Sequence, residues 1–174
     1  MRNLIILEGQ EGAGKSTIIK AILPELTNGA AFDAENILQV NPFEYNLDFQ
    51  KLAIQNSVSL IENFFTAGYR TVVAASFIGD IKQYDRFRKA FKKKTNIYIV
   101  MLVAPKSTRD QRRLKRKKPT TKYWRNRLDK LFPQDTSLKD AKRDYKYIEI
   151  DNGRLSINET VKAIKKALPG VFRK

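Results

Sequence analysis

The chain has 174 residues, enough for one compact domain with a sizeable core, and its formal net charge at pH 7 is +16. It contains neither cysteine nor histidine, which excludes disulfides, thiolate or imidazole metal sites and histidine-based acid–base catalysis. No apolar run approaches the roughly 18 residues that a membrane span requires, and the N-terminus is not expected to be a signal peptide. These features favour a cytoplasmic protein with no membrane partner.

Five short apolar stretches are predicted to be strands of a sheet buried on both faces, because they do not alternate between apolar and polar residues. In chain order they are residues 3–7, 30–32, 71–76, 97–103 and 147–150. The predicted helices cover residues 15–26, 48–67, 81–91, 106–118, 121–131 and a final stretch that begins at a capping box over residues 156–159. Residues 37–46 are expected to be irregular. Strands that alternate with helices predict an α/β fold, with a five-stranded parallel sheet covered on both faces, in a single domain over residues 1–174.

A glycine-rich loop with the pattern G-x-x-x-x-G-K-S lies between the first predicted strand and the first predicted helix. Its glycines let the backbone approach phosphates, and successive N–H groups and the helix N-terminus attract anions. Lys15 would place its charge on the β- and γ-phosphates, and the Ser16 hydroxyl would bind Mg²⁺. We therefore expect ATP and Mg²⁺ here, against the alternative of a plain glycine-rich turn. The residues predicted to bind the nucleotide in this loop are Gly9, Gln10, Glu11, Gly12, Ala13, Gly14, Lys15, Ser16 and Thr17.

The net positive charge is concentrated in one stretch of the sequence. Residues 82–130 hold 19 lysines and arginines against 3 aspartates, while the rest of the chain holds 15 residues of each sign. Such clustering predicts an anionic partner that meets one face of the molecule, and nucleic acid is one such partner. The alternative is a solvated lysine-rich surface.

Two missing motifs narrow the class of nucleotide-binding protein. The sequence has no Asn-Lys-x-Asp motif for guanine, and the strand at residues 71–76 does not end in the acidic pair of motor ATPases. The segment from Glu8 to Thr17 is similar to the phosphate-binding loop of thymidylate kinases, and the order of elements resembles the wider nucleoside monophosphate kinase superfamily. That superfamily includes shikimate and gluconate kinases, chloramphenicol phosphotransferase and the kinase domain of phage polynucleotide kinase. The resemblance implies a three-layer P-loop NTPase fold, ATP-dependent kinase activity and a basic helical lid at about residues 106–130.

The resemblance also implies roles for residues outside the loop. Arg112 and Arg116, four residues apart, resemble the lid arginines that stabilise the transferring phosphoryl group. Arg109 and Arg113 form an equivalent pair. For either pair, the alternative is a solvated, charged helix face. Asp33, after the second strand, resembles the base that accepts the proton of the substrate hydroxyl, or else it is a helix N-cap. Asn152 follows the last strand, in a segment that resembles the loop that flanks adenine in these kinases. The sequence of this segment is equally compatible with a plain turn.

The sequence departs from thymidylate kinases after the third strand, where Ser76-Phe77-Ile78 replaces their Asp-Arg-Tyr. This removes an acidic group near Mg²⁺ and an arginine that would hold an acceptor phosphate. We expect a kinase that acts on a small nucleoside, nucleotide or other hydroxylated metabolite, with the aromatic residues of 41–45 either in the acceptor site or simply packed. One alternative is a polynucleotide 5′-hydroxyl kinase that uses the basic face, with Tyr123 and Trp124 stacking on bases. Another is a nucleotide-dependent nucleic-acid-binding protein without kinase activity.

Overall fold

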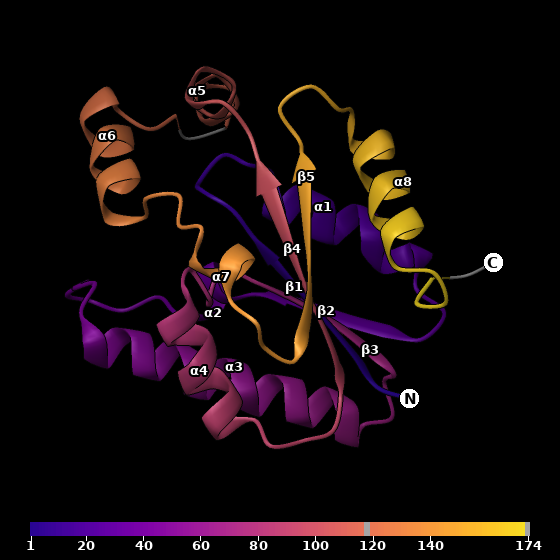
Figure 1. Ribbon diagram of the computed structural model, residues 1–174. Helices are drawn as coiled ribbons and strands as arrows, with labels where there is room; N and C mark the ends of the chain where they lie inside the picture. Colours follow the sequence, from indigo (N-terminus) through magenta and orange to yellow (C-terminus); the bar gives the residue numbers. More distant parts are fainter. Residues whose placement is uncertain (117–118, 173–174) are drawn as a thin grey trace.

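A computed structural model describes residues 1–116 and 119–172 of the chain. Within these ranges five parallel strands form one sheet in the spatial order β2-β3-β1-β4-β5 (Figure 1). The strands are β1 (Asn3–Glu8), β2 (Gly29–Asp33), β3 (Thr71–Ala75), β4 (Asn96–Val103) and β5 (Tyr145–Asp151). The central strand β1 pairs with β3 and β4, so that Asn3 lies opposite Thr71 and Asn96. The predicted fold class, strand number and parallel direction are confirmed.

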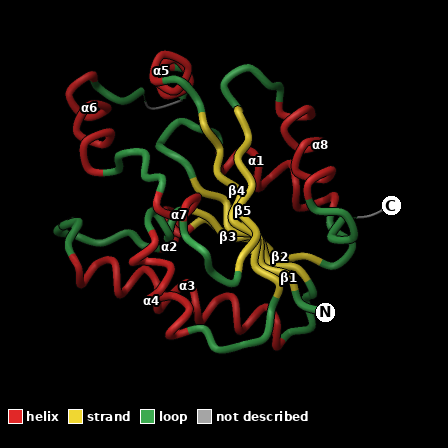
Figure 2. Tube along the Cα trace, viewed as in Figure 1, coloured by secondary structure: helices red, strands yellow, loops and turns green. Residues whose placement is uncertain are grey.

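Helices cover both faces of the sheet, which confirms the predicted layers (Figures 1 and 2). Helices α1 and α8 pack on one face, α3 and α4 pack on the other, and α5 and α6 lie beyond the carboxyl end of β4. None of the helices in the described ranges combines the length and hydropathy needed to cross a membrane. The helices are α1 (Lys15–Ile22), α2 (Ala34–Ile37), α3 (Leu47–Thr66), α4 (Ile81–Ala90), α5 (Lys106–Leu114), α6 (Lys122–Leu131), α7 (Ser137–Asp140) and α8 (Ile157–Ala167).

Alternate residues of the central strand enter the two hydrophobic layers. Leu4 and Ile6 pack in the layer of α3 and α4, whereas Ile5 and Leu7 pack in the layer of α1 and α8, and all four are fully buried. Burial on both faces is the reason that the strand reads as a continuous apolar run. Full burial of each such side chain is worth about 1.5–3 kcal/mol, so this core fixes the carboxyl ends of the strands firmly at one edge of the sheet.

Some element boundaries differ from the predicted ones. The first helix, predicted over residues 15–26, ends at Ile22 and continues as a 3₁₀ turn at Leu23–Glu25, because the ring of Pro24 clashes with the carbonyl of an α-helical turn. Helix α5, predicted over residues 106–118, ends at Leu114, and residues 117–118 lie outside the described ranges. Helices α2 and α7 have four residues each, too few for an apolar period to reveal them.

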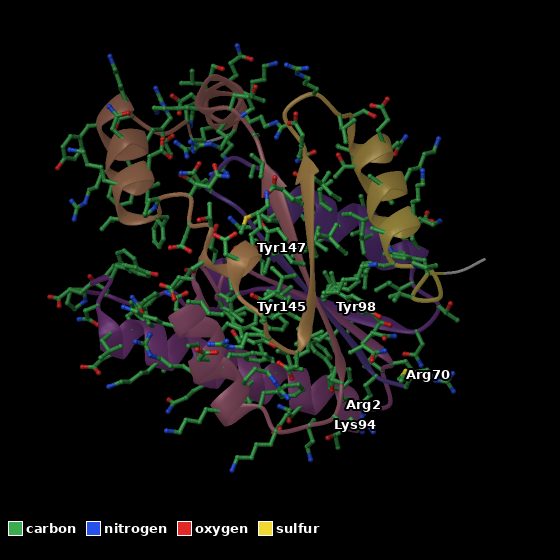
Figure 3. The ribbon with its side chains drawn as sticks, in the orientation of Figure 1. Arg2, Arg70, Lys94, Tyr98, Tyr145 and Tyr147 are labelled. Atoms are coloured by element: carbon green, nitrogen blue, oxygen red, sulfur yellow. The ribbon has the colours of Figure 1, made fainter. Side chains whose placement is uncertain are left out.

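The basic segment 82–130 does not form a single face, which corrects the expectation from the sequence. Lys92, Lys93 and Lys94 follow α4 and precede β4, so they lie at the amino end of the parallel sheet. Lys94 appears near Arg2 at that end, while α5 and α6 lie at the opposite end (Figure 3). A parallel strand necessarily separates the residues before it from those after it, so charge that is clustered in the sequence is split in space.

Candidate active site

The predicted phosphate-binding loop connects the end of β1 to the start of α1. Gly9, Gly12 and Gly14 have φ angles of 140°, 86° and 105°, which L residues rarely adopt. A Cβ atom on Gly14 would also lie 2.9 Å from Nδ2 of Asn152. The loop therefore has the backbone conformation that only glycine permits, and it leads into a helix N-terminus, where anions are stabilised.

Lys15 opens α1, and its side chain spans the loop. Its Nζ donates to the carbonyl of Gly9 at 2.8 Å and forms an ion pair with Oε1 of Glu35 at 3.5 Å. Lys15 is buried and lines the cleft described below, whereas the Glu35 side chain is 55% exposed. Because neither partner encloses the ammonium group, phosphate oxygens can replace them as hydrogen-bond acceptors.

Asp33, the last residue of β2, lies beside the first turn of α1. The Ser16 hydroxyl donates to Oδ2 of Asp33 at 2.6 Å, and the N–H of Glu35 donates to Oδ1 at 3.2 Å. The second bond confirms that Asp33 is the N-cap of α2, while its role as a base stays a prediction.

A hydroxyl and a carboxylate side by side fit Mg²⁺, which takes one or two protein oxygens and otherwise binds water and phosphates. Ser16 and Asp33 supply this pair. Over residues 1–116 and 119–172, no three acidic residues cluster into a protein-only metal cage. The arrangement therefore suits a metal that arrives with a nucleotide.

Sequence reasoning missed the role of Glu8, the last residue of β1. Its carboxyl group is 5% exposed, and Oε1 accepts hydrogen bonds from the N–H groups of Phe77 and Ile78 at 3.1 and 3.0 Å. Burial raises the pKa of Glu8 to about 7, although Lys15 and the two N–H groups oppose the rise. A buried carboxyl group that titrates near neutral pH in a cleft is suited to proton transfer. The signal in the sequence is one acidic residue at the end of an apolar strand.

A cleft of about 650 Å³ opens beside the loop at the carboxyl ends of the strands. This volume lies in the range of small-molecule sites. The loop contributes Gly9, Gln10, Glu11 and Lys15 to its walls, and the remaining walls come from segments after β2, β3 and β4 and from α6. The aromatic side chains that line the cleft are Phe43, Tyr45, Phe49, Phe77, Trp124 and Phe132.

The aromatic residues of segment 41–45 line the cleft and also pack on neighbouring rings, while their part in binding an acceptor stays a prediction. The Phe43 ring lies 5.2 Å from Phe49, and the Tyr45 ring lies 4.6 Å from Phe132. The Tyr45 hydroxyl accepts a hydrogen bond from Nε2 of Gln83 at 3.0 Å. The walls of the cleft are thus formed by rings that support one another across α3 and the segment after α6.

The predicted lid arginines Arg112 and Arg116 face the loop, but both are engaged. Arg112 donates to the carbonyl of Ala13 at 3.2 Å and to the carbonyl of Asn152 at 2.6 Å. Arg116 forms an ion pair with Glu11 at 2.8 Å and is 49% exposed. Arg112 therefore bridges the loop and the segment after β5, whereas the half-exposed Arg116 side chain is held, within the described ranges, by its ion pair with Glu11.

The alternative pair, Arg109 and Arg113, lies on the buried side of α5. Both guanidinium groups donate to Oδ1 of Asp129 in α6, at 2.7 and 2.8 Å, and Arg113 also donates to the carbonyl of Glu11. Burial raises the pKa of Asp129, but hydrogen bonds from Arg109, Arg113 and Lys106 outweigh it and hold the pKa well below its usual range. These buried arginines join α5, α6 and the loop into one unit.

Asn152 lies where the sequence places it, directly after β5, but its side chain is already bonded. Its amide group donates to the carbonyl of Ala13, and its Oδ1 accepts from the Thr160 hydroxyl at 2.6 Å. Its backbone is bonded as well, because its N–H donates to the carbonyl of Val103 at 2.8 Å and its carbonyl accepts from Arg112. A contact between Asn152 and a nucleotide base stays a prediction.

Comparisons with known proteins identify the fold. No protein-family model matches this chain, and no curated protein sequence is significantly similar to it. Among solved structures, a sugar kinase from a Janibacter species superposes with a TM-score of 0.71 at 14% identity and covers 100% of both chains.

Two further structures share the architecture. The tunicamycin resistance protein of Deinococcus radiodurans has a TM-score of 0.62 at 13% identity, covering 100% of this chain and 99% of its own. A gluconokinase from Sinorhizobium meliloti has a TM-score of 0.65 at 12% identity, covering 94% of this chain and 90% of its own. At these identities the likeness concerns the fold, and it establishes that the chain has the three-layer fold of the small P-loop kinases.

Proposed function

We propose that the protein is an ATP-dependent kinase that transfers the γ-phosphoryl group to a hydroxyl group of a small molecule. The observation that carries this proposal is that the phosphate-binding loop and an aromatic cleft share a wall, formed by Gly9, Gln10, Glu11 and Lys15. A donor site and an acceptor site that adjoin in this way allow direct transfer between bound substrates.

On the donor side, loop N–H groups and Lys15 would hold the phosphates, and Ser16 with Asp33 would hold Mg²⁺. A bound magnesium ion would neutralise charge that develops on the transferring phosphoryl group. Arg116 would exchange its ion pair with Glu11 for a phosphate oxygen, whereas Arg112 would stay bonded to the carbonyls of Ala13 and Asn152, beside the position proposed for the base. Both predicted lid arginines thus have distinct proposed roles.

On the acceptor side, Glu8 is better placed than Asp33 to take the proton. Glu8 lines the cleft, whereas Asp33 does not and has both oxygens bonded to Ser16 and Glu35. The acceptor oxygen attacks the γ-phosphorus, the bond from that phosphorus to the β–γ bridging oxygen breaks, ADP leaves, and the hydroxyl proton passes to Glu8. Phosphoryl transfer depends more on positioning than on a strong base, so a carboxylate suffices.

The names of the structural neighbours support a small acceptor: one is a sugar kinase, one a gluconokinase, and the third confers resistance to tunicamycin. The polynucleotide kinase alternative loses its main support, because the basic segment is divided between the two ends of the sheet. A small-molecule kinase that works in the cytoplasm also fits the cysteine-free sequence.

The test is to incubate the protein and Mg²⁺ with γ-labelled ATP and a panel of acceptors. The panel contains sugars, nucleosides, nucleoside monophosphates, antibiotics and a 5′-hydroxyl oligonucleotide. We expect label on a small hydroxylated compound. If ATP binds but no member accepts label, the nucleotide-binding alternative without phosphotransfer replaces the kinase.

A further inference from the structure

The charge that lines the cleft is opposite in sign to the charge of the whole molecule. The chain carries a net +16, yet the cleft is lined by five carboxyl groups and one amine. These ionisable residues are Glu8, Glu11, Lys15, Glu35, Asp80 and Asp135. Among the residues that the structure describes, no arginine lines the cleft, and Lys15 belongs to the phosphate-binding loop. Within residues 1–116 and 119–172, the acceptor part of the cleft therefore offers no cation to a phosphate or carboxylate of the substrate.

The acidic groups near the loop are compensated. Glu11 forms ion pairs with Arg113 and Arg116, at 3.4 and 2.8 Å, and Glu35 pairs with Lys15. Glu8 is buried in an environment that favours its neutral form. These three groups therefore add little net negative charge to the end of the cleft where ATP would bind.

Asp80 and Asp135 are different, because neither forms an ion pair with any lysine or arginine in the described ranges. Oδ1 of Asp80 caps α4 through the N–H of Gln83, and Oδ1 of Asp135 accepts from the N–H of Ser137, both at 2.7 Å. The second oxygen of each carboxylate makes no such contact there. Both residues are half-buried and line the cleft.

The two carboxylates belong to one wall. The hydroxyl of Ser137 donates a hydrogen bond to Asp135. The same hydroxyl accepts a hydrogen bond at 3.0 Å from the N–H of Ile81, the residue that follows Asp80. Tyr45 lies near the same charge: burial raises its pKa, the hydrogen bond from Gln83 opposes the rise, and the nearby Asp80 adds to it. Asp80 at the start of α4 and Asp135 just before α7 thus both line the cleft.

The rings of Tyr45, Phe49, Phe132 and Trp124 line the same cleft and provide an apolar surface. Rings of this kind bind flat or ring-shaped ligands by stacking and by burial of apolar area. Two carboxylates that form no ion pair in the described ranges, together with these rings, match a ring compound with a positive charge.

We propose that the phosphate acceptor is a ring-containing alcohol that bears a protonated amine, and that Asp80 and Asp135 bind this amine. The inference rests on the proposed kinase function, since it names the acceptor class of the same site. It excludes nucleoside monophosphates and 5′-phosphorylated or carboxylated compounds, because their charge would face two carboxylates without a compensating arginine.

Three aromatic alcohols of similar size test this proposal by direct binding in the presence of Mg²⁺ and a non-hydrolysable ATP analogue. Phenylalaninol is a cation, N-acetylphenylalaninol is neutral and 3-phenyllactate is an anion. We expect phenylalaninol to bind about tenfold more tightly than the neutral compound, as a half-buried charge pair predicts, and 3-phenyllactate to bind most weakly. Equal binding of the three, or no detectable preference for the cation, would overturn the proposal.

The variants Asp80→Asn and Asp135→Asn remove the charge but keep a side-chain oxygen that can accept the N–H of Gln83 or Ser137. Asparagine is also a favoured N-cap, which suits the position of Asp80. Each should weaken phenylalaninol binding three- to tenfold and leave the neutral compound unchanged. Asp140→Asn, on the exposed side of α7 and outside the cleft lining, is the matched control and should change neither. Because this assay measures binding without turnover, it separates the two proposals. If phenylalaninol is preferred but no phosphoryl group is ever transferred, the kinase function is refuted and this inference stands. If the protein phosphorylates an anionic acceptor, this inference is refuted and the kinase function stands.

Discussion

Two carboxylates at the carboxyl ends of β1 and β2, which β3 separates in the sheet, have different environments, and this difference suggests separate roles. Asp33 has both oxygens in hydrogen bonds, to the Ser16 hydroxyl and the N–H of Glu35. Glu8 is buried at the cleft, where desolvation dominates its pKa. We therefore propose that Glu8 serves acid–base catalysis near neutral pH and that Asp33 helps to hold Mg²⁺.

The first prediction concerns Glu8→Gln. Because the base must be ionised, kcat of the native protein should rise as pH increases through about 7, and this acidic limb should vanish in Glu8→Gln. We expect kcat at pH 8 to fall about 100-fold, within the usual range for a lost general base. A pH–rate profile measures both effects. Asp33→Asn is the comparison: its acidic limb should remain, and more Mg²⁺ should be needed for the half-maximal rate. An acidic limb that persists in Glu8→Gln would rule Glu8 out as the general base.

The same substitution has a consequence for stability that serves as its folding control. Folded Glu8 retains its proton up to about pH 7, whereas the unfolded chain releases it near 4.5. The native protein should therefore lose stability relative to Glu8→Gln as pH rises from 4.5 to above 7, by about 3 kcal/mol. Urea unfolding at pH 5 and pH 8 measures this difference.

At the scale of elements, α5 and α6 are joined to the phosphate-binding loop by buried charge. Arg113 is fully buried and contacts Asp129 of α6 as well as the backbone of Glu11. Buried charges of this kind are stable only while their partners remain. Part of the segment predicted to be a basic lid therefore has a structural role: its buried arginines hold α5 and α6 against the loop. We call these buried contacts the clamp.

The second prediction is that Asp129→Asn loosens this clamp. Loss of a charged acceptor for Arg109 and Arg113 should cost about 2 kcal/mol in the free energy of unfolding, as measured by urea titration. Hydrogen exchange should rise first in α5 and α6. The control Asp85→Asn removes an exposed ion pair with Arg143 and should cost less than about 1 kcal/mol. Equal effects of the two variants would show that the buried contacts do not hold the lid.

The elements that the sequence predicts well are those with a local signal. The loop from Gly9 to Ser16, the apolar strands and the Ser156 capping box each have a pattern within a few residues. The site beyond the loop depends on contacts between distant segments, such as Glu8 with Phe77 or Arg113 with Asp129. The hydrogen bond from Ile81 to Ser137, which joins the starts of α4 and α7, likewise exists only in the folded chain, as does the cleft that Asp80 and Asp135 both line.

At the scale of the whole molecule, the large positive charge and the proposed chemistry are largely separate. Several cations of α5 and α6 are neutralised by internal carboxylates, and the lysines after α4 lie at the far end of the sheet. The charge therefore gives the molecule a field that attracts anions such as ATP without lining the acceptor site.

The third prediction is that replacing Lys92, Lys93 and Lys94 together by serine leaves kcat/KM for ATP and acceptor within twofold of the native value. Nonspecific affinity for a single-stranded oligonucleotide should fall, with the slope of log K against log salt reduced by about 2. Steady-state kinetics and binding titrations at several salt concentrations measure the two quantities. A tenfold loss of kcat/KM would show that the far end of the sheet takes part in catalysis.

The central claim is that the loop beside the aromatic cleft delivers the γ-phosphoryl group of ATP to a small alcohol. The most direct measurement is transfer of label from γ-labelled ATP to the best acceptor of the panel by the native protein, Lys15→Ala and Lys20→Ala. Lys20 lies on the exposed side of the same helix and is the matched control. We predict transfer by the native protein and Lys20→Ala and a loss of at least about 100-fold in Lys15→Ala. Undiminished transfer by Lys15→Ala, or no transfer by the native protein, would contradict the account.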